Sequence, residues 1–139
     1  MSKTIAGSLP VAALSAETVL RVDAAADLWK VAAALAAADV GVLVVGQGDD
    51  VQGVVSERDV VRALAAHRGA SETTAAEIAQ RNLVWCDADA DVADVAEEMM
   101  ERYVRHVLVE RDGRLVGIVS ARDLLGAYAS GDLADPDDV

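Results

Sequence analysis

The stretch Gly53-Val54-Val55-Ser56-Glu57-Arg58-Asp59-Val60-Val61 decides the fold, because the chain contains it twice. It returns 64 residues later as Gly117-Ile118-Val119-Ser120-Ala121-Arg122-Asp123-Leu124-Leu125. In each copy a short apolar run leads through Ser-x-x-Asp into a segment of good helix formers. This pattern predicts a strand that passes directly into a helix.

The repeat continues backwards at the same offset without a gap. About 15 of the 43 positions from Asp23 to Ala65 are identical to their partners, and several of the others exchange one aliphatic residue for another. A fixed internal period indicates repeated structural units, each of which needs a neighbour to bury its apolar face.

Each repeat is expected to contain the same elements. In the second repeat, Thr74-Ala75-Ala76-Glu77 is a capping-box pattern that opens a short helix, and Asp112-Gly113 is a hairpin turn. The expected strands are 83–85, 106–110 and 115–119, and the expected helices are 91–103 and 121–129. In the first repeat, Pro10 suits a helix start. There the helices are expected at 27–38 and 57–67, and the strands at 42–45 and 51–55.

These elements predict an α/β fold of two pseudo-twofold-related repeats, each β-α-β-β-α, in one module. The first repeat is placed at residues 9–67 and the second at 74–129, with a linker at 68–73. Residues 1–8 are expected to be flexible. Residues 130–139 form an acidic tail that is expected to be disordered.

The composition limits the classes of function. Hydrophobic residues make up 53% of the chain, and the formal net charge is −12. So acidic a protein is a poor partner for nucleic acid or for an anionic membrane surface, while a few local arginines can still bind a small anion. The start of the chain does not read as a signal peptide, and no apolar run approaches the roughly 18 residues of a membrane span. A cytoplasmic protein is expected.

The sequence offers no assembled catalytic or metal set. Cys86 is the only cysteine, which excludes an intramolecular disulfide and a cysteine-based zinc site. The loop with Asp87, Asp89 and Asp91 lacks the glycine and the terminal glutamate of a calcium loop. We therefore expect no enzyme activity and no metal.

The two repeats resemble CBS (cystathionine-β-synthase) motifs, and the resemblance covers about residues 9–128. It rests on the paired Gly-aliphatic-aliphatic-Ser-x-x-Asp signatures. It implies a Bateman-type module whose clefts between motifs bind AMP, ADP, ATP or S-adenosylmethionine as a regulatory ligand, with no cofactor required. CBS pairs commonly form dimers through their helices, so a homodimer is expected.

The Ser-x-x-Asp pairs allow two interpretations. As plain sequence, each pair can cap its own helix. The resemblance implies that Ser56 and Ser120 lie on the phosphate side of a nucleotide and that Asp59 and Asp123 bind ribose. Arg58 and Arg122 would add charge-assisted bonds to phosphate.

The resemblance also implies that Arg105 and His106 contact ligand phosphates. The first repeat has Gly41 and Val42 at these positions, so two unequal sites are expected. The adenine walls would come from apolar residues that also read as ordinary core: Val19, Leu20, Val40, Leu83, Val84 and Val104.

These observations predict a regulatory module that senses an adenosine nucleotide for a protein partner that the sequence does not identify. The alternative is a ligand-free dimerisation or protein-interaction module, in which the CBS motifs are purely structural.

Overall fold

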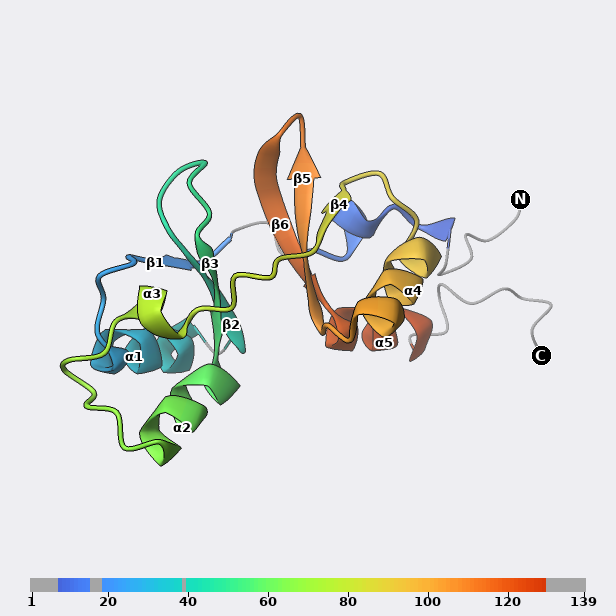
Figure 1. Cartoon of the computed structure of the whole chain (residues 1–139). Helices are drawn as coiled ribbons and strands as arrows, with labels where there is room; N and C mark the ends of the chain where they lie inside the picture. The colour runs from blue at the N-terminus through green and yellow to red at the C-terminus, as the bar shows by residue number, and fades with distance from the viewer. Residues whose placement is uncertain (1–7, 16–18, 39, 130–139) are drawn as a thin grey trace. The chain divides into compact units, whose positions relative to one another are not determined.

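The computed structural model describes residues 8–15, 19–38 and 40–129 (Figure 1). The described residues fall into two compact units. We call Val19–Leu83 the central unit, and the described parts of Met1–Thr18 and Val84–Val139 the terminal unit. The predictions for residues 1–7 and for the tail at 130–139 lie outside the described residues.

The central unit contains a three-stranded sheet in the order β1-β2-β3. Strand β1 runs parallel to β2, and β2 runs antiparallel to β3. Its elements are β1 (Arg21–Val22), α1 (Leu28–Ala38), β2 (Val42–Val45), β3 (Gly53–Ser56), α2 (Glu57–Ala65) and α3 (Ala75–Ile78).

The terminal unit repeats this arrangement with the order β4-β5-β6 and the same strand directions. Its elements are a 3-10 helix η2 (Val11–Ala13), β4 (Trp85–Asp87), α4 (Val92–Arg102), β5 (His106–Arg111), β6 (Arg114–Ser120) and α5 (Ala121–Ala129). The predicted α/β class with two related motifs is therefore confirmed.

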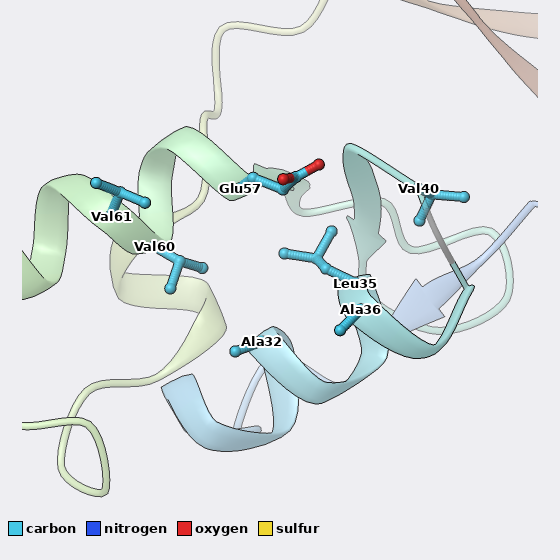
Figure 2. A pocket seen from close by; sticks show the side chains of 7 residues that line it. All are labelled: Ala32, Leu35, Ala36, Val40, Glu57, Val60 and Val61. Atoms are coloured by element: carbon cyan, nitrogen blue, oxygen red, sulfur yellow. The ribbon is translucent and has the colours of Figure 1, made fainter.

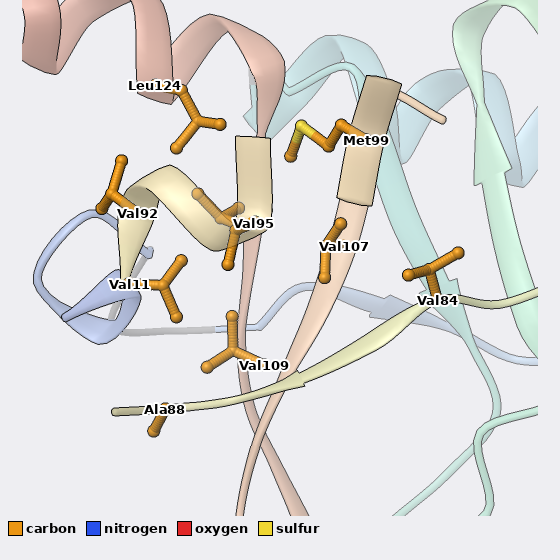
Figure 3. Packing of buried hydrophobic residues seen from close by; sticks show 10 residues of the cluster. Val11, Val84, Ala88, Val92, Val95, Met99, Val107, Val109 and Leu124 are labelled. Atoms are coloured by element: carbon orange, nitrogen blue, oxygen red, sulfur yellow. The ribbon is translucent and has the colours of Figure 1, made fainter. Parts of the chain in front are cut away.

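Each unit has its own aliphatic core, because one face of its sheet packs against its helices. The core of the central unit consists of Val22, Ala26, Val31, Leu35, Leu43, Val45, Val55, Val60 and Ala75. The core of the terminal unit consists of Val11, Val84, Ala88, Val92, Val95, Met99, Val107, Val109, Val119 and Leu124 (Figure 3). Val or Leu at alternate strand positions fills both cores, as period-two burial requires.

Each repeat opens with a short leading helix, η2 in the first repeat and α3 in the second. Each leading helix packs in the unit that holds the sheet of the other repeat. The Val11 amide donates to the Ala90 carbonyl at 2.7 Å, and the equivalent Ala75 amide donates to the Ala26 carbonyl at 2.7 Å. Val11 and Ala75 are both fully buried, and Figure 3 shows Val11 beside α4. The two compact units therefore do not coincide with the two sequence repeats, because each unit contains the leading helix of the other repeat. The boundaries 9–67 and 74–129 stay a prediction about the repeat.

Two expected strands begin later than the sequence suggested. Strand β3 starts at Gly53 rather than at residue 51, because the preceding loop turns through Gly46 and Gly48, with φ angles of 128° and 55°. Strand β4 starts at Trp85 rather than at residue 83, although the Val84 carbonyl still accepts from the Leu108 amide at 2.9 Å. The turn at Asp112-Gly113 is confirmed, with φ angles of 54° and 78° that suit a tight hairpin.

None of the described helices has the length and apolar content that crossing a membrane requires.

Candidate functional site

The strand–helix junction of the first repeat is a closed capping box. The Ser56 Oγ accepts from the Asp59 amide at 3.2 Å, and Asp59 Oδ2 accepts from the Ser56 amide at 2.8 Å. The Ser56 hydroxyl also donates to Asp59 Oδ2, at 2.9 Å. The capping interpretation of this pair is therefore confirmed, and the serine hydroxyl hydrogen is already used.

A residue from outside the first repeat completes this junction. Gln80 Nε2 donates to Asp59 Oδ1 at 2.9 Å, so that both carboxylate oxygens of Asp59 accept hydrogen bonds within the protein. Asp59 is 6% exposed. A buried carboxylate requires such bonding, because an unpaired buried charge is costly.

The corresponding junction of the second repeat is more open. Asp123 Oδ2 accepts from the Ser120 amide at 2.8 Å, and the Ser120 Oγ accepts from the Asp123 amide at 3.0 Å. Asp123 is exposed. Within the described residues, neither Asp123 Oδ1 nor the Ser120 hydroxyl hydrogen has a partner. One carboxylate oxygen and one hydroxyl donor therefore remain available here.

The basic pair of the second repeat lies at this same junction. His106 is the direct partner of Ser120 in the β5–β6 ladder, and the Arg105 carbonyl accepts from the Ala121 amide at 2.8 Å. Directly paired antiparallel residues have their Cα atoms about 4.5–5.5 Å apart. In the central unit the equivalent contact is made by Gly41, whose carbonyl accepts from the Glu57 amide at 3.1 Å. The structure thus brings Arg105, His106, Ser120 and Asp123 together, and the first repeat has no basic counterpart.

Burial lowers the pKa of His106 below its ordinary value of 6.5, the neighbouring Arg105 guanidinium lowers it further, and the Asp123 carboxylate opposes both effects. In the folded protein the imidazole is therefore neutral at a pH where the unfolded chain begins to take up a proton. The neutral ring keeps one nitrogen as a donor and one as an acceptor.

Acidification should therefore destabilise the protein through His106. Because the folded pKa lies below the unfolded one, the stability that His106 contributes is fully present above about pH 6.5 and is lost as the pH falls from there through the lower pKa of the folded state. In urea unfolding between pH 7.5 and pH 5.5, His106→Gln should lose less stability than the wild type. His67→Gln, at an exposed histidine, serves as the control. An unchanged pH response in His106→Gln would contradict this assignment.

The other predicted site residues are not part of the hydrogen-bonded groups described above. Arg58 and Arg122 are exposed in the first turns of α2 and α5, and no ion pair involves either of them within the described residues. Among the predicted adenine walls, Val84 is a core residue and Val104 and Val40 pack against the cores. The others are half-buried or exposed positions that precede β1 and β4: Val19, Leu20 and Leu83.

An apolar groove lies between α1 and α2 of the central unit, with a volume of about 250 Å³ (Figure 2). Its lining is Ala32, Leu35, Ala36, Val40, Glu57, Val60 and Val61. Of the predicted site residues only Val40 contributes to it. Neither Ser56 nor Asp59 lines this groove.

The structure gives Cys86 no catalytic character. Burial raises the pKa of the thiol to about 11, and the carboxylates of Asp87, Glu110 and Glu98 act in the same direction. The thiolate that a nucleophile requires is therefore scarce at neutral pH. Among the described residues, no cluster of His, Cys, Asp and Glu side chains could hold a metal ion.

Comparison with known proteins identifies the class to which these two junctions belong. The CBS domain model matches residues 11–66 and again residues 75–130. The chain belongs to the CBS domain family and carries its motif as a tandem pair. Members of this class typically act as regulatory modules rather than as catalysts.

Individual relatives are similar to the chain at moderate identity. Hypoxic response protein 1 of Mycobacterium tuberculosis is 36% identical over 88 residues, which span 62% of either protein. An uncharacterised conserved protein from Pyrococcus horikoshii has a TM-score of 0.80 at 26% identity, over 88% of this chain and 94% of that one. The CBS domain protein PAE2072 from Pyrobaculum aerophilum, solved in complex with AMP, has a TM-score of 0.74 at 30% identity, over 88% of this chain and 99% of that one.

Sequence reasoning missed Gln80. The sequence held one weak indication of its role: the residue 64 positions earlier is Ala16, which has no side-chain amide. The two repeats therefore differ at a position where one of them places a hydrogen-bond donor.

Proposed function

We propose that the chain is a regulatory module that binds an adenosine nucleotide or S-adenosylmethionine at the Ser120–Asp123 junction, and that it acts on a protein partner. The observation that carries this proposal is exposed Asp123, whose Oδ1 has no partner among the described residues, beside the Arg105–His106 pair and a Ser120 hydroxyl that donates to none of those residues. The AMP complex of PAE2072 supports the ligand class.

The chemistry of the junction fits the phosphate-bearing members of this ligand class. A carboxylate oxygen accepts from a ribose hydroxyl but repels a phosphate, so Asp123 favours the sugar. The Ser120 hydroxyl and the Arg105 or Arg122 guanidinium can donate to phosphate oxygens, and bonds from a cation are the stronger ones. The start of α5 adds a positive helix end. Local charge can thus select an anionic ligand although the whole chain is acidic.

The ligand-free interaction module remains the second candidate, and one observation favours it. Both Asp59 and Asp123 cap their own helices, which is a structural role that requires no nucleotide. The two candidates differ in what they predict for Asp123, because a purely structural cap has no use for its free oxygen.

We also infer that the protein forms a homodimer through its helices. Several large apolar side chains on helices are exposed, among them Trp29 at 67%, Val61 at 64% and Met100 at 77%. Burying such side chains against a second copy of the chain would remove apolar surface from water, which favours association.

Adding nucleotide should raise the melting temperature. A ligand at about 100 times its dissociation constant stabilises the fold by roughly 2.7 kcal/mol, which corresponds to a shift on the order of 5–10 °C for a chain of this size. The measurement is a thermal-shift panel with AMP, ADP, ATP and S-adenosylmethionine. Asp123→Asn should abolish the shift, because an amide can still accept from the Ser120 amide but presents a weaker partner to ribose.

Asp94→Asn is the matched control, since it removes an exposed carboxylate from α4 of the same unit. It should melt and respond to nucleotide as the wild type does. If no nucleotide in the panel stabilises the wild type at saturating concentration, the interaction module is the better interpretation. A full response in Asp123→Asn would refute the role of that carboxylate.

A further inference from the structure

The backbone of Gln80 is fixed against the edge of the central sheet. The Val54 amide donates to the Gln80 carbonyl at 3.1 Å, and the Gln80 amide donates to the Val54 carbonyl at 2.7 Å. Gly53 permits this approach, because a Cβ at that position would lie 2.7 Å from the Gln80 oxygen. The Gln80 backbone is therefore held opposite Val54, two residues before Ser56. From there its side chain reaches Asp59 on α2.

This placement engages both carboxylate oxygens of Asp59 at the first junction. Asp59 Oδ1 accepts from Gln80, while Oδ2 accepts from the amide and the hydroxyl of Ser56. Because Asp59 is also only 6% exposed, a ribose hydroxyl could reach its Oδ1 only if the Gln80 side chain moved aside. At the second junction the equivalent carboxylate is exposed and one of its oxygens has no partner in the described part of the chain.

We propose that Gln80 closes the carboxylate of the first repeat to ligands, so that the chain binds a single nucleotide, and that removing the Gln80 amide opens a second, latent site at Asp59. This rests on the proposed function, because it assigns the binding stoichiometry of the same ligand. Gln80 is a specificity-determining residue here, since it decides which of two similar junctions accepts a sugar.

The latent site should be the weaker of the two. It has Gly41 and Val42 in place of Arg105 and His106, so the phosphate loses its charge-assisted donors. Loss of such contacts should weaken binding by at least about tenfold relative to the second repeat.

The test is isothermal titration of AMP into the full chain. The wild type should bind one AMP per chain, and Asp59→Asn should bind one AMP with an affinity within about threefold of the wild type, because Asp59 does not contact the ligand. Gln80→Ala should show an additional, weaker binding event that raises the stoichiometry to two. Adding Asp59→Asn to Gln80→Ala should remove this event. Gln47→Ala, at an exposed glutamine of the β2–β3 loop, is the matched control and should keep a stoichiometry of one.

The outcomes separate this inference from the proposed function. If the wild type and Gln80→Ala both bind one AMP, Gln80 does not close the Asp59 carboxylate to ligands. The proposed function then still stands. If Asp59→Asn loses AMP and Asp123→Asn keeps it, the assignment of the open junction is reversed and the inference is overturned. If only Gln80→Ala binds, the closure is real and the proposed site at Asp123 is wrong. If no variant binds AMP, both proposals fail for this ligand.

Discussion

Leu43→Ala should destabilise the protein by about 2–5 kcal/mol, the range found when a buried leucine is truncated and its neighbours cannot close the cavity. Leu43 is 1% exposed and lies on β2, the middle strand of the central sheet, where it is paired with Val55. Strands border it on both sides and helices cover its face, so little can move inward. Urea unfolding followed by circular dichroism measures the change.

Leu125→Ala removes the same atoms from an exposed position. Leu125 is 70% exposed on α5, so its truncation should change the free energy of unfolding by about 0.5 kcal/mol or less. A loss below about 1 kcal/mol in Leu43→Ala would mean that the middle of the sheet is not tightly packed.

Gly46→Ala should cost about 2–4 kcal/mol, because two effects combine at this position. The φ angle of Gly46 is 128°, a region that residues with a Cβ rarely adopt, and the added Cβ would collide with the Asp50 carbonyl oxygen. The loop after β2 would have to move, and Gly46 also donates its amide to the Val22 carbonyl at 3.1 Å. Unfolding free energies from denaturant titration provide the measurement.

Gly48→Ala separates backbone strain from collision. Gly48 has a φ of 55°, and a Cβ there would meet nothing within 4 Å. The left-handed conformation alone should cost about 1–2 kcal/mol. Equal losses in the two variants would show that the contact with Asp50 is relieved without cost, which would contradict the prediction for Gly46.

Local patterns were sufficient to predict most of the fold. The Ser-x-x-Asp pairs correctly gave the starts of α2 and α5, because a cap is a local interaction between residues three apart. The helix expected at 91–103 is α4, bounded by Asp91 and by Tyr103 with a φ of 55°. The strand starts were less accurate, because they depend on which residues a neighbouring strand reaches. In the first repeat the Gly46–Gly48 turn decides this.

The candidate site was predictable only in part. Sequence reasoning located Ser56, Asp59, Ser120 and Asp123 and left open whether they cap or bind. It also recognised that the basic pair Arg105–His106 occurs only once. The bond from Gln80 to Asp59 could not be foreseen, because it joins residues 21 positions apart across the repeat boundary. No periodicity in the sequence indicates that the segment that leads into one repeat lies against the sheet of the other.

That exchange of leading helices has a consequence for how the molecule can be divided. A protease that cleaves within residues 68–73 would produce two fragments, each carrying a piece of the other's hydrophobic interior. The N-terminal fragment would keep Val11, which the terminal unit buries, and the C-terminal fragment would keep Ala75, which the central unit buries. The nicked protein should therefore persist as a non-covalent complex, and neither fragment alone should be a stable domain.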